Sequence, residues 1–238
     1  MGLHVCAPRQ HLNPVMQAGT REIARHYLPL RAHYWYARIK LASDPLYSGV
    51  GAVLAKTREP LLDLGCGIGL LVHTLRAQGF SGDYRGVDVD EAKIASAGAT
   101  ATRAQLTGTR FEALDLARGF PEHHGSVALL DIVQFLPPPA QEALLESAIA
   151  SLTPGAVLVM RSGLQREGWR LRFTRGVDRL ARMTGWMNVG PQRYPRREEL
   201  EQRFARHGLT ASFAPLHGRL PFENWLICAR REYAEAED

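Results

Sequence analysis

Four aspartates recur in or directly after short apolar runs of the chain. Asp63, Asp88, Asp115 and Asp131 accompany the runs 61–64, 84–88, 109–114 and 127–133. If these runs are parallel strands, their carboxyl ends meet at the sheet edge where such sheets bind ligands. Any one of these acids can be a structural carboxylate with its own partner. Together, the four predict a ligand site at that edge.

A glycine loop, Gly65-Cys66-Gly67-Ile68-Gly69, joins the first run to a helical pattern that begins at Leu70. Glycine allows a sharp turn and a close approach of the backbone to a ligand. A dinucleotide fingerprint places its third glycine three residues after the second, but here the interval is two. Asp63, two residues before the loop, suits an ammonium group better than a pyrophosphate. The spacing favours S-adenosylmethionine, with NAD as the alternative.

Two of the acids allow competing interpretations. Asp88 ends its run 19 residues after Gly69, where a carboxylate can accept hydrogen bonds from both ribose hydroxyls. It can instead cap the helix that begins near Glu91, although Asp90 can also supply that cap. Asp131 interrupts an apolar run and therefore needs a polar partner.

The surrounding pattern alternates strands and helices, which is typical of a parallel α/β sheet. A fifth strand is expected at 155–161, and helices at 69–79, 90–104 and 138–152. A helix at 197–207 and two antiparallel strands at 211–215 and 223–229 follow. The predicted fold is an α/β, doubly wound sheet of seven strands, five of them parallel, with helices on both faces.

The first 59 residues are predicted to form an N-terminal arm and a helical cap, followed by one domain over 60–238. Residues 1–20 lack periodicity and are interpreted as a loose arm. Residues 21–47 show helical spacing with Pro29 as a break between two short helices.

Composition narrows the function classes. The 238 residues, 45% of them apolar, suffice for one core, and the net charge of +5 favours anionic partners without choosing among them. Cys6, Cys66 and Cys228 have no zinc or redox spacing, so no metal is expected. No export signal or membrane span is recognisable, and a cytoplasmic location is expected.

The stretch 161–206 contains 12 arginines and five acids. Arginine can clamp phosphate or carboxylate groups. Apolar residues recur among these arginines at helical spacing, which predicts a basic lid near 162–196 or an interfacial helix. The alternative is a solvated helix that packs its apolar side on the core. An anionic acceptor and a peripheral membrane contact both follow from the first interpretation.

The sequence resembles the class I, Rossmann-like S-adenosylmethionine-dependent methyltransferases. The likeness rests on motif I at 62–69, the acid of Gly86-Val87-Asp88, the segments 111–115 and 130–136, and an LxPGG-like turn at 152–156 with Ala156 replacing the second glycine. It implies S-adenosylmethionine as cofactor, with Asp63 and Gly65 at the methionine portion, Asp88 at the ribose, Asp115 at the adenine and Asp131 at the amino end. The implied cofactor-binding set is Asp63, Gly65, Cys66, Gly67, Gly69, Asp88, Val89, Asp115, Leu116, Asp131 and Ile132.

The segment 36–47 resembles one that precedes the core in bacterial methyltransferases encoded near fatty-acid or polyene biosynthesis genes. That likeness adds Tyr36, Arg38 and Lys40 as residues that fold over the cofactor, although they can equally be solvated helix residues. Such relatives often carry histidine where this chain has Gln134, and glutamine cannot act as a base.

No catalytic residue is assigned from the sequence. His33, Tyr34 and His217 are candidates for proton removal, and each also suits a structural role. Methyl transfer needs little acid chemistry, because proximity and orientation supply most of the rate. The expected acceptor is a small-molecule, acyl-type or lipid-precursor compound that is methylated at oxygen or carbon. A nucleic-acid methyltransferase, an NAD-binding oxidoreductase and a non-catalytic nucleotide-binding module stay as alternatives.

Overall fold

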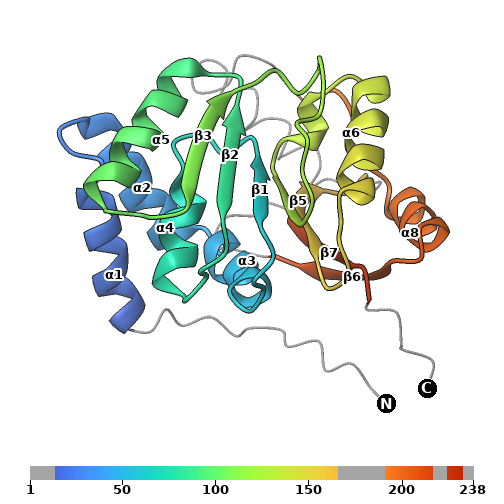
Figure 1. The fold of residues 1–238 in the computed structure, drawn as a ribbon, viewed down its shortest axis with the longest axis horizontal. Coiled ribbons are helices and arrows are strands. Elements are labelled where there is room, and N and C mark those ends of the chain that lie inside the picture. The colour runs from blue at the N-terminus through green and yellow to red at the C-terminus, as the bar shows by residue number, and fades with distance from the viewer. Residues whose placement is uncertain (1–13, 166–190, 217–223, 233–238) are drawn as a thin grey trace.

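One seven-stranded sheet forms the centre of the protein, in the order β3-β2-β1-β4-β5-β7-β6 (Figure 1). The computed structural model describes residues 14–165, 191–216 and 224–232. The strands are β1 (Leu61–Leu64), β2 (Tyr84–Asp88), β3 (Thr109–Ala113), β4 (Ser126–Leu130), β5 (Val157–Gly163), β6 (Thr210–Pro215) and β7 (Asn224–Arg230). β1 to β5 pair in parallel, and β7 runs antiparallel to β5 and β6. The predicted sheet is therefore confirmed.

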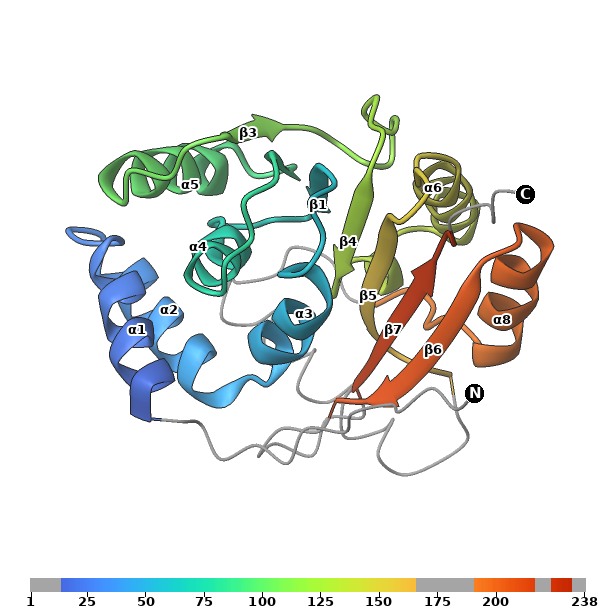
Figure 2. The same cartoon turned by 60° about the horizontal axis from the view of Figure 1, so that its bottom comes forward.

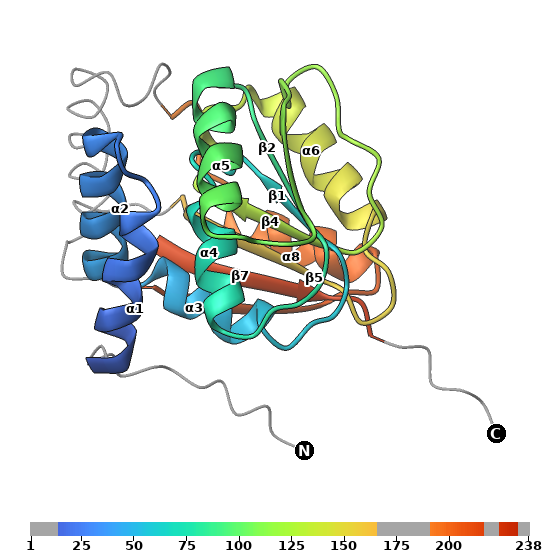
Figure 3. The ribbon, with the colours of Figure 1, turned by 60° about the vertical axis from the view of Figure 1, so that its left-hand side comes forward.

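Helices cover both faces of this sheet (Figure 3). They are α1 (Pro14–Arg25), α2 (Arg31–Ser43), α3 (Leu46–Leu54), α4 (Leu70–Ala77), α5 (Glu91–Arg103), α6 (Pro138–Ala150) and α8 (Arg197–Arg206), with a 3-10 turn η1 (Val133–Phe135). The pleat of β1 separates two cores, because Leu62 and Leu64 pack with α6 and α8 while Leu61 packs with α3 and α4. The doubly wound prediction holds. Asp63 alternates onto the same side as Leu61.

The N-terminal helices form a third core with α4. Tyr27, fully buried, donates a hydrogen bond from its hydroxyl to the carbonyl of Ile68 at 3.1 Å. The cap is therefore attached directly to the glycine loop. The predicted break at Pro29 is confirmed, since α1 ends at Arg25 and α2 begins at Arg31. The loose arm expected to reach residue 20 is wrong in its last part, because α1 already begins at Pro14.

Two further differences concern element ends. A third cap helix, α3, lies beyond the two expected ones, and it packs Leu46, Val50 and Leu54 into the core. The fourth strand, expected to reach residue 133, ends at Leu130. Asp131 adopts φ +62°, a left-handed conformation that ends the strand and starts the turn into η1. Its carboxylate therefore lies at the sheet edge and does not interrupt a strand.

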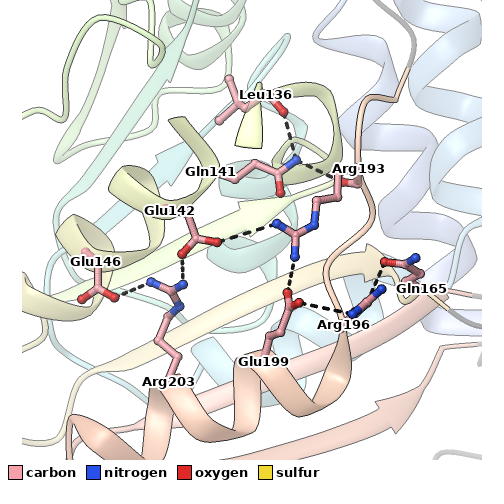
Figure 4. A network of polar contacts seen from close by, with 9 residues as sticks. All are labelled: Leu136, Gln141, Glu142, Glu146, Gln165, Arg193, Arg196, Glu199 and Arg203. Atoms are coloured by element: carbon pink, nitrogen blue, oxygen red, sulfur yellow. Dashed lines mark hydrogen bonds and ion pairs between the residues drawn. The ribbon is translucent and has the colours of Figure 1, made fainter. Parts of the chain in front are cut away.

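A network of polar side chains joins α6 to α8 on one face of the sheet (Figure 4). Arg203 forms ion pairs with Glu142 and Glu146, and Arg193 pairs with Glu199 at 2.5 Å. The buried amide of Gln141 donates to the carbonyls of Leu136 and Arg193 at 2.9 and 3.0 Å. These bonds fix the segment that carries Tyr194. Within the described ranges, no helix is long and apolar enough to cross a membrane.

Candidate active site

A cavity of about 620 Å³ opens at the carboxyl ends of the parallel strands. Its lining comes from the glycine loop, from the ends of β2, β4 and β5, and from α2 and the turn into α3. A volume of this size is typical of small-molecule sites. The predicted ligand edge of the sheet is therefore hollow, and the N-terminal cap closes one side of it.

The glycine loop turns tightly where it lines this cavity. Gly65 has φ +79°, and a Cβ built on it would lie 2.2 Å from Cγ2 of Ile132. Gly67 has φ +56°, and a Cβ there would meet no atom within 4 Å. Gly65 is therefore needed for packing beneath the loop, whereas the space above Gly67 is open for a ligand.

Asp63 lies at the bottom of the cavity and is almost fully buried. The hydroxyl of Tyr84 donates to its Oδ2 at 2.5 Å. Burial raises the pKa of Asp63 to about 7, while the Tyr84 hydrogen bond acts in the opposite direction. A carboxyl group with this pKa is only half ionised near neutral pH, so a cation bound beside it would favour its ionised form.

Asp88 ends β2 beside the same loop. Its Oδ2 accepts a hydrogen bond from the Gly67 amide at 2.9 Å, and its Oδ1 accepts one from the Asp90 amide at 3.0 Å. Asp90, in turn, caps α5 by accepting from the amides of Ala92 and Lys93. The helix cap is thus supplied by Asp90. Asp88 stays oriented toward the cavity, and each of its oxygens retains a lone pair for a ligand hydroxyl.

A buried arginine crosses the opposite wall of the cavity. Arg161 of β5, 3% exposed, donates from Nε to Oδ1 of Asp131 at 2.7 Å and pairs with the other oxygen through Nη2. Its Nη1 lies 2.5 Å from Oδ1 of Asp44, and Lys40 pairs with the other oxygen of Asp44 at 2.7 Å. We call Lys40, Asp44, Asp131 and Arg161 the cavity ion cluster.

The charges of the cavity ion cluster stabilise one another around the buried guanidinium of Arg161. Burial would lower the pKa of Arg161, but Asp131 and Asp44 raise it above its ordinary value. Burial would likewise raise the pKa of Asp44, but Arg161 and Lys40 hold it below its ordinary value. Arg161 and Asp44 are therefore both charged at neutral pH. The predicted polar partner of Asp131 is Arg161.

The far end of the cavity is lined by uncharged polar groups. The Gln134 side chain is buried, and its Oε1 accepts a hydrogen bond from the Ser162 hydroxyl at 3.3 Å. Tyr194 and Asn224 line the same end, together with the apolar side chains of Phe135 and Leu216. This lining can orient a small molecule through hydrogen bonds and apolar contact.

The cavity brings together most of the predicted cofactor-binding residues. Those that line it are Tyr36, Lys40, Asp63, Gly65, Cys66, Gly67, Asp88, Asp131 and Ile132. The other five predicted positions, Arg38, Gly69, Val89, Asp115 and Leu116, do not line it. Asp115 pairs with Arg118 at 3.2 Å, and Val89 is 67% exposed.

The candidates for proton removal lie outside the cavity lining or outside the described ranges. Nδ1 of His33 is 2.8 Å from the Ser96 hydroxyl on α5, and burial lowers the pKa of this histidine. Tyr34 packs edge-on against Trp35. His217 and residues 166–190 of the predicted basic lid lie outside the described residues.

Sequence reasoning missed Arg161, Asp44, Tyr194 and Asn224 as cavity residues. The pattern groups Arg161 with the arginine-rich stretch, whereas the structure places it inside β5. A signal was present, because Arg161 directly follows the apolar residues Val157 to Met160, and a charge that extends such a strand needs a buried partner. The partner Asp44 lies 117 residues earlier in the sequence, so spacing alone could not identify it.

Comparison with known proteins gives a consistent picture. The sequence model of a methyltransferase domain matches residues 55–171. No curated protein matches the sequence at a significant level. Magnesium protoporphyrin IX methyltransferase from Synechocystis PCC 6803 with bound SAH superposes with a TM-score of 0.60 and 16% identity, covering 94% of this chain and 90% of that chain.

Two further solved structures have the same fold. DhpI in complex with SAH gives a TM-score of 0.59 at 16% identity and covers 94% of this chain and 100% of its own. NcsB1 is an O-methyltransferase of neocarzinostatin biosynthesis that was solved with S-adenosylmethionine and 2-hydroxy-5-methyl naphthoic acid. It gives a TM-score of 0.58 at 17% identity and covers 85% of this chain and 57% of its own.

The matched span begins just before β1 and includes the glycine loop, Asp88 and the turn after β4. The order of the seven strands and the position of the cavity are independent of that match, and they agree with it. Residues 55–171 therefore match a methyltransferase domain, and the chain shares the Rossmann-like fold of methyltransferases solved with SAH.

Proposed function

We propose that the protein transfers a methyl group from S-adenosylmethionine to a small-molecule acceptor of the acyl or lipid-precursor type, at oxygen or carbon. One observation carries this proposal. The cavity is continuous from the glycine loop to the end lined by Gln134, Tyr194 and Asn224, so one space has an acidic, loop-lined end and a neutral polar end.

The acidic end fits the cofactor. The open space above Gly67 accommodates an adenosyl group against the backbone, and the free lone pairs of Asp88 suit the ribose hydroxyls. Asp63, half ionised when no cation is bound beside it, would bind the ammonium group of the methionine portion in its charged form. S-adenosylmethionine supplies an electrophilic methyl group on a sulfonium.

The cavity ion cluster would hold the methionine end in place. Arg161 neutralises Asp131 and Asp44, which prevents an excess of negative charge around the cofactor carboxylate. Lys40 and Tyr36, which also line this wall, are the groups we assign to that carboxylate. Cofactor contacts are not assigned to the five predicted residues that lie outside the cavity lining, which are Arg38, Gly69, Val89, Asp115 and Leu116.

At the neutral end, the chain would act mainly by positioning. Gln134 and Asn224 can orient an acceptor hydroxyl or carbonyl, and Phe135 and Leu216 can exclude water from it. No histidine is among the described residues that line the cavity. We therefore assign catalysis to the alignment of the acceptor with the methyl group, a contribution that can reach about 7–11 kcal/mol.

NcsB1 supports a small-molecule acceptor, because that neighbour was solved with a hydroxylated naphthoic acid. The test is a screen with S-adenosylmethionine that carries a labelled methyl group. Phenols, hydroxy acids, acyl thioesters and fatty acids form one arm, and DNA and RNA form the other. We expect label transfer in the first arm only, weakened by Asn224→Leu. Transfer to nucleic acid alone would overturn the proposal.

A further inference from the structure

The exposed large apolar side chains of the described residues are concentrated in one short segment of the sequence. Among the described residues, five large apolar side chains are more than a third exposed, and four of these five lie between positions 28 and 39. These four are Leu28, Leu30, Trp35 and Ile39, with exposed fractions of 42, 50, 57 and 63%. Concentrated exposure of this kind marks an interaction surface more often than scattered single residues do.

Trp35 and Ile39 lie on α2, and Leu28 and Leu30 lie just before it. Helix α2 itself lies beside α1 at the outer side of the molecule (Figure 3). Trp35 and Ile39 are one helical turn apart and therefore share a face. The other side of α2 packs Ala37 and Leu41 into the third core. The helix thus has one buried apolar side and, opposite it, two apolar residues, Trp35 and Ile39, that are more than half exposed. We call Leu28, Leu30, Trp35 and Ile39 the cap face.

Basic residues border the cap face. Helix α2 contains no aspartate or glutamate, and Arg31 precedes Trp35 by one turn on the same face. Arg38 lies directly before Ile39, and the neighbouring α1 adds exposed Arg21 and Arg25 against a single acid, Glu22. Exposed tryptophan and aliphatic residues beside arginine are typical of helices that lie in the surface of an anionic membrane.

The cap face also reaches the active-site cavity. Ile39 is both highly exposed and part of the cavity lining, and Lys40 beside it belongs to the cavity ion cluster. A surface that rests on the cap face would therefore lie at the mouth of the cavity. An apolar acceptor could pass from that surface to the site without crossing water.

We propose that the cap face docks on the surface of an anionic phospholipid bilayer and presents the cavity to an amphiphilic acceptor held there. The second half of this statement rests on the proposed function. A second copy of the chain is a poorer fit to the cap face, because a two-fold contact would bring the basic borders of both copies together.

The experiment is co-sedimentation of the full chain with phosphatidylcholine vesicles, with and without phosphatidylglycerol. We expect binding to the anionic vesicles only. The double variant Leu30→Ser/Trp35→Ser should bind at least about tenfold more weakly, since it removes two apolar anchors. Arg31→Gln should weaken binding about fivefold. Arg206→Gln, on α8 at the opposite end of the molecule (Figure 2), is the matched control and should bind like wild type.

Trp35 itself reports where the bilayer lies. Its emission should shift to the blue on adding anionic vesicles, and Trp35→Phe should remove that shift while keeping most of the binding. Equal binding of the double variant and wild type, or binding independent of lipid charge, would overturn the proposal. A wild-type dimer that Trp35→Ser converts to a monomer would also overturn it, because the cap face would then be a self-interface.

Titration with S-adenosylmethionine separates this proposal from the proposed function. If the cofactor binds and labelled methyl is transferred while no vesicle is bound, docking alone is wrong. If anionic vesicles are bound but the cofactor is not, docking stands and the proposed function fails.

Discussion

Two regions of the molecule use the same chemical motif, an arginine between two carboxylates, in different surroundings. Arg161 pairs with Asp44 and Asp131 at the cavity, and Arg203 pairs with Glu142 and Glu146 between α6 and α8 (Figure 4). The Asp44 and Asp131 side chains are 13% and 33% exposed, whereas both glutamates are close to half exposed. Solvent therefore screens the second cluster more strongly than the first.

This difference determines what each cluster contributes. An ion pair on the surface is worth about 0–1 kcal/mol, because water competes for both charges. Breaking a buried pair leaves a charge without a partner and costs about 3–5 kcal/mol. The α6–α8 network thus assists docking of the elements, while the cavity ion cluster fixes charged groups in the place where a cofactor would bind.

The largest effect is expected for Arg161→Met. Asp44 and Asp131 would lose their shared cation, and the free energy of unfolding should fall by about 3–5 kcal/mol in urea denaturation. If the variant still folds, S-adenosylmethionine should bind much more weakly. Combining Arg161→Met with Asp44→Asn and Asp131→Asn removes the stranded charges and should restore most of the stability. Full stability of Arg161→Met alone would refute the account of this cluster.

The second prediction separates cofactor binding by Asp88 from the stability that the cavity ion cluster provides. Asp88→Ala removes a carboxylate that we assign to the ribose, and cofactor affinity should fall by about 1.5–3 kcal/mol, roughly 10- to 100-fold, with the fold intact. Asp88→Asn keeps one acceptor oxygen and should lose less cofactor affinity. Isothermal titration measures both, and unchanged affinity of Asp88→Ala would remove that residue from the site.

A smaller effect on cofactor affinity is expected from the protonation of Asp63. Its pKa of about 7 means that the ionised form, which suits an ammonium group, prevails only above neutral pH. Cofactor affinity should therefore fall as pH drops below 7, by about tenfold for each unit well below the pKa. The free energy of unfolding changes in the opposite direction, because it falls as pH rises from about 4 to 7. Over this range the folded state holds a proton that the unfolded chain releases.

Tyr84→Phe tests the cause of that profile. The lost hydrogen bond stabilises the ionised carboxylate of Asp63, so its removal should move the midpoint of the affinity profile to higher pH. At pH 7 the affinity should fall by about two- to tenfold. A profile that keeps its midpoint would mean that Asp63 does not control cofactor binding.

The smallest effect is expected for Arg203→Met, the counterpart of Arg161→Met in the cluster with the more exposed carboxylates. Its stability should fall by about 0–1 kcal/mol, and cofactor affinity should stay at the wild-type value. Urea denaturation and titration of both variants under the same conditions complete the comparison. A loss as large as that of Arg161→Met would show that burial is not what distinguishes the two clusters.

Sequence patterns predicted the parts of the fold that repeat locally. Apolar runs located the strands, and the glycine loop with Asp63 and Asp88 located the site, because these features lie within about 25 residues of one another. The end of β4 was misplaced because Ile132 and Val133 are apolar, although the left-handed turn at Asp131 already ends the strand.

Contacts between distant segments could not be predicted from the sequence. The pairing of Asp44 with Arg161 depends on how the cap packs against β5, which no local pattern encodes. Tyr194 enters the cavity because Gln141 and Arg193 fix its segment against α6, a further long-range arrangement. The start of helix α1 was missed in part because Gly19 is a poor helix former, and packing of the cap decides the outcome.

The most direct test of the central claim is isothermal titration of the wild-type protein with S-adenosylmethionine, its demethylated product and NAD in parallel. The account predicts micromolar binding of the first two compounds and no binding of NAD. Binding of NAD alone, or of none of the three, would contradict it.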